Sequence, residues 1–202
     1  DLMNELPGFS HPAEAQILAR VTADVRGRAS AVRLMVFDVD GILTDGSLWY
    51  GEHGEAVKPF NALDGHGLRL LREQGIRVAW VSGRKSAITA RRAAELGISP
   101  ALQGVHDKIT TVEELARDAG LGLGAVGYMG DDIIDLPVLR RVGFAVSVPN
   151  APFYVGQAAH WVTGLPGGRG AVRECCDLIL AAQGRLGACF TASLSTLGGA
   201  IQ

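Results

Sequence analysis

The sequence is poor in cysteine, and the cysteines it has form no recognisable binding pattern. Cys175, Cys176 and Cys189 are the only three in 202 residues. They show no Cys-x-x-Cys spacing, and no histidine is placed to complete a zinc site with them. We therefore expect the three thiols to be small, buried residues, and the protein to work in the reducing environment of the cytoplasm.

Excess charge and long apolar runs are also missing. The chain has 19 Lys and Arg against 21 Asp and Glu, a net charge of −2. This balance favours neither a nucleic acid nor an anionic membrane as a partner. No apolar run approaches the roughly 18 residues that a membrane helix needs. The first twelve residues lack the basic region and apolar stretch of a signal peptide, so we expect none.

Apolar segments instead alternate with helical patterns along most of the chain. The run "RLMVFD" at 33–38 is typical of a strand covered on both faces. Further strands are expected at 76–81, 101–103, 125–129, 144–148 and 161–163, and helices at 65–74, 85–96, 107–119, 133–142, 151–159 and 170–183. This order predicts an α/β fold, a Rossmann-like parallel sheet with helices on both faces.

Three segments depart from this alternation. A helix is expected over 12–29, inside an N-terminal helical extension of residues 1–30. Residues 47–60 predict a small β-hairpin insertion, with apolar side chains that contact either the core or a second subunit. The main domain then covers 31–184. Residues 185–202 have weak periodicity and are expected to form a C-terminal tail.

Carboxylates gather where two of the predicted strands end. Asp38 and Asp40 follow the first strand, with Gly41 next, and Asp131 and Asp132 follow a later one. Because carboxyl ends of parallel strands share one edge, we expect these acids to meet. Close carboxylates repel each other unless a cation compensates them, and Mg²⁺ prefers oxygen ligands. The alternative is that each acid caps a helix or a turn.

Two further residues are placed to hold an anion. Ser82 follows the strand at 76–81 and opens a helix, so its hydroxyl and the helix amides offer a phosphate seat, or an ordinary N-cap. Lys108 stands at a helix start, where a cation opposes the helix dipole. That placement favours a function for Lys108 over a solvated lysine.

Taken together, D-x-D-G, Ser, Lys and G-D-D-x-x-D on successive strand ends resemble the haloacid dehalogenase superfamily of phosphohydrolases. The receiver domain of response regulators uses similar residues in the opposite layout. The resemblance implies that Asp38 is the nucleophile and that Asp40 is the general acid and base. It also implies that Ser82 and Lys108 bind the phosphoryl group. Mg²⁺ would be held by Asp38, the Asp40 backbone carbonyl and Asp131, while Asp132 and Asp135 would orient Lys108 or water.

The segments "FNALDGHG", "SGRK", "GDDIIDLPV" and "GGRGAVRE" resemble a narrower group, the 3-deoxy-D-manno-octulosonate 8-phosphate phosphatases. These are capless tetramers. About 40 residues separate Asp40 from Ser82 and about 26 separate Ser82 from Lys108. Both gaps are shorter than the roughly 50 residues of an independent cap domain. The resemblance implies an anionic sugar phosphate as substrate and a homotetramer with the site near a subunit interface. The implied substrate-binding residues are Asp40, Asn61, Ala62, Leu63, Asp64, Gly65, Arg69, Arg84, Arg92 and Lys108.

Two other functions remain open at this point. One is a phosphatase for a sialic-acid-like 9-phosphate, which shares nearly the whole motif set. The other is a non-catalytic oligomerisation module of the same fold. The second is disfavoured because a scaffold needs no nucleophile, and the chain keeps the complete set of catalytic residue types.

Overall fold

The computed structural model describes the backbone of residues 11–198 and the side chains of residues 11–194. Its centre is a six-stranded sheet in which all strand pairs are parallel, in the order β5-β4-β1-β6-β7-β8. The strands are β1 Leu34–Phe37, β4 Arg77–Val81, β5 Ala101–Leu102, β6 Val126–Met129, β7 Phe144–Ser147 and β8 Trp161–Val162. The α/β prediction is confirmed.

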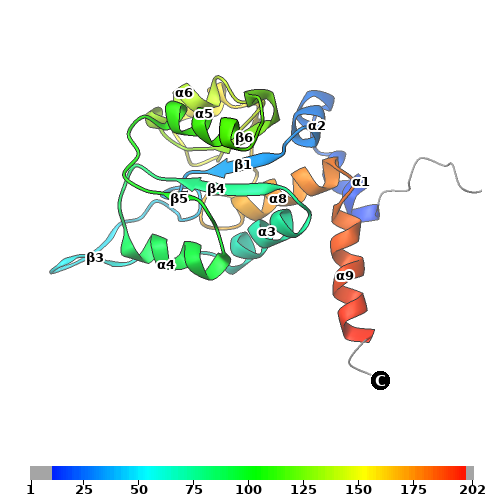
Figure 1. Ribbon diagram of the computed structural model, residues 1–202, viewed down its shortest axis with the longest axis horizontal. Coiled ribbons are helices and arrows are strands. Elements are labelled where there is room, and N and C mark those ends of the chain that lie inside the picture. Colours follow the sequence, from blue (N-terminus) through cyan, green and yellow to red (C-terminus); the bar gives the residue numbers. More distant parts are fainter. Residues whose placement is uncertain (1–10, 199–202) are drawn as a thin grey trace, which may run out of the picture.

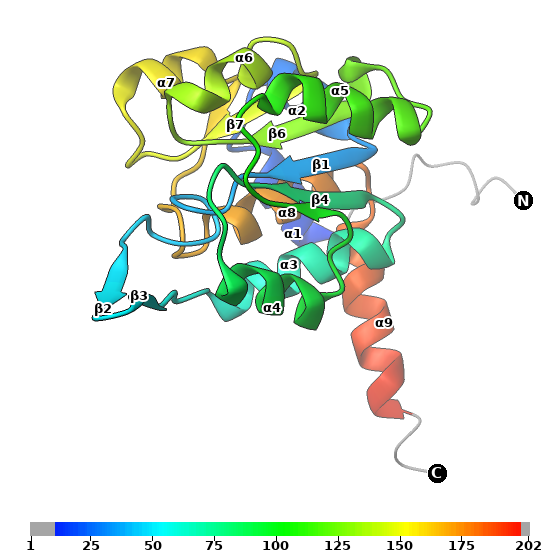
Figure 2. The ribbon, with the colours of Figure 1, turned by 60° about the vertical axis from the view of Figure 1, so that its left-hand side comes forward.

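Helices cover both faces of this sheet, as Figures 1 and 2 show. One face carries α3, α4 and α8, and the other carries α5, α6 and α7. The helices are α1 Pro12–Leu18, α2 Ala23–Ser30, α3 Ala62–Glu73, α4 Ala87–Leu96, α5 Lys108–Asp118, α6 Leu136–Leu139, α7 Phe153–Ala158, α8 Ala171–Ala182 and α9 Leu186–Gly198, with 3₁₀ turns η1 Leu123–Ala125 and η2 Ile133–Asp135.

Strand β1 is the centre of the core. Met35 and Phe37 pack into the cluster beneath α3 and α8, while Leu34 and Val36 pack into the cluster beneath α5 and α6. All four side chains are buried, as expected for a strand covered on both faces. Burying a large apolar side chain stabilises the fold by about 1.5–3 kcal/mol, so β1 anchors the residues that follow it.

Two predicted helices are shorter than expected. The helix expected over 12–29 is two helices, because Thr22 is extended and its hydroxyl caps α2 by accepting a bond from the Val25 amide at 3.2 Å. The helix expected over 133–142 begins as the 3₁₀ turn η2, capped by Asp132, and α6 ends at Leu139. In the first segment a cap restarts the helix where periodicity alone predicts continuity.

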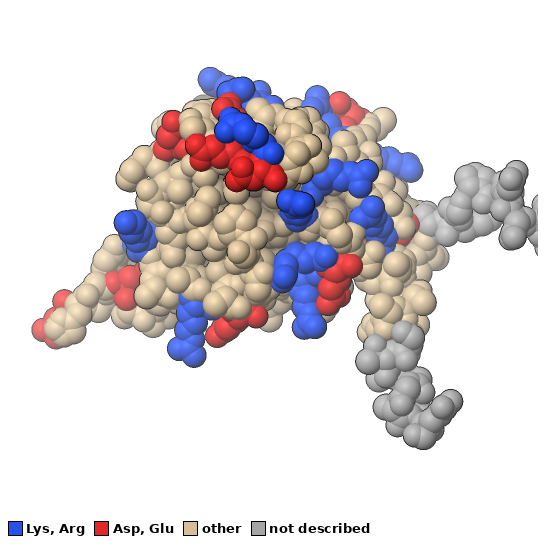
Figure 3. Space-filling model, viewed as in Figure 1, with Lys and Arg blue, Asp and Glu red and all other residues tan. Residues whose placement is uncertain are grey.

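The tail expected over 185–202 forms helix α9 in its described part. Its start is held by α1, because the buried Glu14 carboxylate accepts a hydrogen bond from the Gly187 amide at 2.7 Å. From there α9 projects away from the domain, and its described part carries no charged side chain in Figure 3. This cap comes from a distant part of the chain, which is why local periodicity missed the helix.

The expected hairpin insertion is confirmed as antiparallel strands β2 Trp49–Gly51 and β3 Gly54–Val57. It projects from the domain, away from the sheet, in both ribbon views. Trp49 is 56% exposed, Tyr50 64% and Val57 52%. These apolar side chains therefore do not pack into the core of their own chain. Among the described residues, no helix is long and apolar enough to cross a membrane.

The N-terminus of α8 is capped from another helix. Its own N-cap residue, Gly170, has no side chain, and the buried Asp64 of α3 takes its place. Asp64 Oδ1 accepts a hydrogen bond from the Arg173 amide at 3.0 Å. Burial raises the pKa of Asp64, although these amide bonds oppose the rise. Asp64 thus ties α3 to the helix that packs against α1, α2 and α3.

We predict that Asp64→Ala lowers the free energy of unfolding by about 0.5–2 kcal/mol, the usual cost of a lost N-cap. Asp64→Asn keeps an accepting oxygen and should retain most of the stability. Asp24→Ala, at an exposed carboxylate on α2, is the control. Urea unfolding measures all three, and equal stability of the Ala and Asn variants would contradict a capping role.

Candidate active site

The strand order brings three polar strand ends together. Strand β1 lies between β4 and β6, and Phe37 pairs with both Trp80 and Met129. Asp38, Ser82 and Asp131, which follow these strands, therefore meet at one edge of the sheet. They line an open cleft of about 410 Å³. The lining residues are Asp38, Asp40, Gly46, Leu48, Ser82, Gly83, Arg84, His106, Lys108, Asp131, Asp132 and Ile134.

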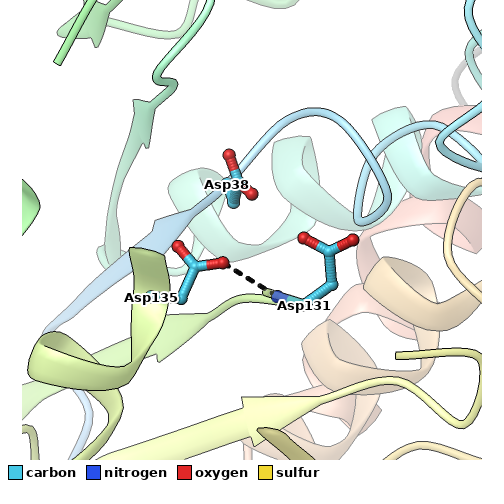
Figure 4. A group of neighbouring side chains, drawn as sticks. All are labelled: Asp38, Asp131 and Asp135. Carbon is cyan, nitrogen blue, oxygen red and sulfur yellow. Dashed lines mark hydrogen bonds between the residues drawn. The ribbon is translucent and has the colours of Figure 1, made fainter. Parts of the chain in front are cut away.

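Three carboxylates form a cluster at the base of this cleft. One oxygen each of Asp38, Asp131 and Asp135 lies within 4.8 Å of the others. Figure 4 shows Asp135 accepting a hydrogen bond from the Asp131 amide, at 3.0 Å. Burial and the Asp135 charge raise the pKa of Asp38 to about 6, while burial and the charges of Asp38 and Asp135 raise that of Asp131 to about 8. The carboxylates therefore repel one another when they are ionised together.

Lys108 compensates part of this negative charge. Its Nζ atom lies 2.8 Å from Asp135 Oδ1 and 3.1 Å from Asp38 Oδ1. It also donates to the Tyr128 hydroxyl at 3.2 Å. Burial lowers the pKa of Lys108, but the two carboxylates outweigh burial and raise it above its usual value. The cation that opposes the dipole of α5 is thus directed at the acid cluster.

The site fits a hard divalent cation. Lys108 pairs with two of the three carboxylates, and all the candidate ligand atoms of the cluster are oxygens, as Mg²⁺ prefers. Gly41 has φ +86°, and a Cβ there would lie 1.8 Å from Asp131 Oδ2. The glycine therefore lets the loop after β1 approach Asp131 closely.

Asp40 lies in the cleft but outside this cluster. Its Oδ1 atom is 3.0 Å from Lys58 Nζ and 3.8 Å from Arg84 Nη1. Ser82 is buried, and its hydroxyl accepts from the Arg84 amide at 3.3 Å. Ser82 and Arg84 therefore face the acids from the β4 side. The carboxylate of Asp40 pairs with Lys58 and Arg84, whereas Lys108 pairs with the acid cluster.

Other predicted substrate residues lie outside the cleft of their own chain. Asn61 caps α3, and Ala62, Leu63, Asp64 and Gly65 form its first turn. Leu63 is 60% exposed. Arg69 pairs with Glu73 on the surface, and Arg92 lies 6.0 Å from the Phe60 ring. A single chain brings together the acids, Ser82, Lys108 and Arg84. The start of α3, Arg69 and Arg92 lie apart from that group.

The segment around "GGRGAVRE" packs against the loop that carries the acids. The Gly168 amide donates to the Ile42 carbonyl at 3.0 Å. A Cβ on Gly167 would lie 1.8 Å from the Gly41 carbonyl oxygen. Glu174 on α8 accepts from the Gly164 amide at 2.9 Å. This segment therefore supports the loop after β1 within its own chain.

Sequence reasoning missed two buried polar residues here, Lys58 and Tyr128. Tyr128 lies in the apolar strand β6, and its hydroxyl donates a short hydrogen bond to Asp135. Lys58 follows the hairpin and is only 6% exposed. Neither stands in a motif. The only signal was a tyrosine in an otherwise apolar strand and a lysine beside a proline.

Comparison with known proteins places this geometry in a family. Residues 101–171 match the haloacid dehalogenase-like hydrolases. Over 166 residues the chain is 43% identical to the 3-deoxy-D-manno-octulosonate 8-phosphate phosphatase KdsC of Escherichia coli strain K12, covering 82% of this chain and 88% of that protein. The chain belongs to the KdsC family of haloacid dehalogenase-like hydrolases.

Solved structures of KdsC phosphatases share the fold. The enzyme from Yersinia pestis is 44% identical with a TM-score of 0.81, covering 83% of this chain and 90% of its own. The enzyme from Moraxella catarrhalis is 41% identical with a TM-score of 0.82, covering 86% of this chain and 99% of its own. That structure contains a magnesium ion, a phosphate ion and a KDO molecule.

The raised carboxyl pKa values predict how pH affects the stability of the metal-free protein. With pKa values near 6 and 8, Asp38 and Asp131 hold protons in the folded chain that the unfolded chain releases near pH 4. Stability should therefore fall as pH rises from about 4 to 8. Mg²⁺ held by these carboxylates would require their ionised form, so we expect it to raise the melting temperature more at pH 8 than at pH 5.5.

Calorimetric melting with and without Mg²⁺ at both pH values measures this difference. Asp131→Asn should lose most of the Mg²⁺ effect, whereas Asp118→Asn, at the end of α5, serves as the control. An equal Mg²⁺ effect at both pH values would contradict the assignment of these pKa values.

Proposed function

We propose that the protein is an Mg²⁺-dependent phosphomonoesterase that hydrolyses 3-deoxy-D-manno-octulosonate 8-phosphate to the free sugar acid and phosphate. The observation that carries the proposal is the position of Asp38. Its carboxylate stands at the open end of the central strand, beside Lys108 and two further acids. The KdsC relatives at 43% identity, and the phosphate and KDO in the Moraxella catarrhalis structure, support the substrate.

The proposed reaction has two steps, and the arrangement of these groups supports it. An Asp38 carboxylate oxygen attacks phosphorus while the bond from phosphorus to the sugar oxygen breaks, giving an aspartyl phosphate. Asp40, as a carboxylic acid, gives its proton to the departing sugar oxygen. Asp40 then takes a proton from water, which attacks phosphorus and breaks its bond to Asp38. Inorganic phosphate leaves, and Asp38 returns as a carboxylate.

The remaining groups stabilise charge on the transferring phosphoryl group. We assign Ser82 and Lys108, which line the cleft, to donate hydrogen bonds to its oxygens. Asp38, the Asp40 carbonyl and Asp131 would hold Mg²⁺, which would supply positive charge to the same oxygens. Asp135 holds Lys108 at 2.8 Å, and its other oxygen accepts the amides of Asp131 and Asp132. We assign Asp132 and Asp135 to orienting these groups.

Substrate recognition is assigned to the arginines and to the start of α3. A sugar acid carries a carboxylate, which matches the fork of an arginine side chain. Arg84 lines the cleft and is the first candidate. Asn61–Gly65, Arg69 and Arg92 lie outside it, so their role requires a neighbouring subunit. Leu63 adds no charge. A sialic-acid-like 9-phosphate has the same carboxylate and phosphate, and remains the alternative substrate.

We further propose a homotetramer in the cytoplasm, with the β2-β3 hairpin as a subunit contact. Trp49, Tyr50 and Val57 expose apolar side chains on an element that projects from the domain. Such a surface is typical of a protein interface. The three cysteines are unpaired, as is usual in a reducing compartment.

Asp38→Asn should abolish turnover, by about 10⁴-fold or more, because the amide cannot act as the nucleophile. Phosphate release from 3-deoxy-D-manno-octulosonate 8-phosphate with Mg²⁺ measures this, and circular dichroism checks the fold. Asp118→Asn is the matched control. Turnover within ten-fold of the unaltered protein would refute the assignment of Asp38 as the nucleophile.

Addition of EDTA should also stop the reaction, because it removes Mg²⁺. Faster phosphate release from a nonulosonate 9-phosphate would establish the alternative substrate.

Trp49→Asp should shift the protein from tetramer towards monomer in sedimentation velocity, because it puts a charge into the apolar contact. Phe153→Asp, on α7, changes a residue that is 75% exposed in the same way and serves as the control. An unchanged tetramer in the Trp49 variant would remove the hairpin from the interface.

A further inference from the structure

Lys58 is a buried cation that the reaction described above does not use. It follows strand β3, precedes Pro59 and is 6% exposed. Its Nζ atom lies 3.0 Å from Asp40 Oδ1 and 3.5 Å from Glu55 Oε1. It donates a hydrogen bond to the Thr89 hydroxyl on α4 at 3.3 Å. The ammonium group thus touches three elements, one of which carries Asp40.

Stability alone does not account for this lysine. Removing an ammonium group from water costs several kcal/mol, and buried ion pairs often stabilise a fold no better than apolar residues of the same size. The pairing partners are themselves constrained. Glu55 accepts a hydrogen bond from the Ser86 hydroxyl at 2.7 Å and lies 3.4 Å from Arg84. Lys58 is therefore held from both sides against one oxygen of Asp40.

The geometry of Asp40 shows what this contact achieves. Its Oδ1 atom is fully buried and faces Lys58, while Asp40 itself lines the cleft. The two ion pairs of Asp40, with Lys58 and Arg84, both involve Oδ1. These cations on one oxygen restrict the rotation of the carboxylate. Its second oxygen can then exchange a proton with a group in the cleft that Asp40 lines.

We infer that Lys58 is a positioning residue for Asp40: it holds the carboxylate in the orientation that delivers a proton to the leaving oxygen. The inference rests on the proposed function, because it assigns Asp40 as the general acid. It adds a role for the hairpin. Glu55 and Lys58 belong to this insertion, and Thr89 belongs to α4, so these segments together set the position of the acid.

The inference predicts that two kinds of substrate respond differently when Lys58 is changed. A sugar alkoxide is a poor leaving group that needs a proton as its bond to phosphorus breaks, whereas p-nitrophenolate leaves without one. A displaced Asp40 should therefore slow the hydrolysis of a sugar phosphate far more than that of p-nitrophenyl phosphate. General instability or weaker metal binding would slow both substrates alike.

The test compares kcat for the two substrates in Lys58→Met, with saturating Mg²⁺. We expect a loss of about 100-fold on the sugar phosphate, the lower end of the usual contribution of a general acid, and about 3-fold or less on p-nitrophenyl phosphate. Arg91→Met, which removes an exposed ion pair with Glu95 on α4, is the matched control. It should leave both rates unchanged.

Thr89→Val provides a second test that does not depend on burying an uncharged residue at position 58. It removes one hydrogen bond from Lys58 and keeps the shape of the side chain. We expect the same selective loss at a smaller size, about 5-fold on the sugar phosphate. This variant decides the question if thermal melting shows that Lys58→Met is unfolded.

Equal losses on the two substrates in a folded variant, or no loss on either, would overturn the positioning role while leaving the proposed function intact. A wild-type protein that releases phosphate from neither substrate would instead refute the proposed function, and the role of Lys58 with it. A selective loss on the sugar phosphate supports both.

Discussion

The contact between one buried ammonium group and a cluster of carboxylates is the constraint on which the site depends. Asp38, Asp131 and Asp135 gather at the end of the central strand, and Lys108 pairs directly with Asp38 and Asp135. This arrangement leaves a net negative charge in a partly buried place. A divalent cation would relieve it, which is why we propose Asp38 and Asp131 as its ligands.

Glycines in the surrounding backbone allow the acidic residues and their loops to approach one another closely. Gly41 lets the loop after β1 approach Asp131, and Gly167 and Gly168 let a second segment pack behind the same loop. The support then reaches α8, whose first turn is capped by Asp64 from α3. Residues far apart in sequence thus support the loop that carries Asp38 and Asp40.

Much of the sheet could be predicted because its signals are local. Strand β1 is a continuous apolar run, and Asp38, Ser82 and Asp131 stand directly after strands that prove to be neighbours. What escaped prediction depends on distant partners. Helix α9 starts where Glu14 caps it, and Lys58 is buried because Asp40, Glu55 and Thr89 surround it. Apart from Glu55, which stands close to Lys58 in the sequence, these partners lie too far along the chain for a local pattern to carry that information.

The bond between Glu14 and Gly187 joins the two ends of the described chain. Helix α1 packs against α8 and α9, so the first and last helices form one unit on the side of the sheet that α8 covers. Loss of α1 would therefore loosen the start of α9 as well. These two helices would fray together, while the strands that bear the acids stay folded.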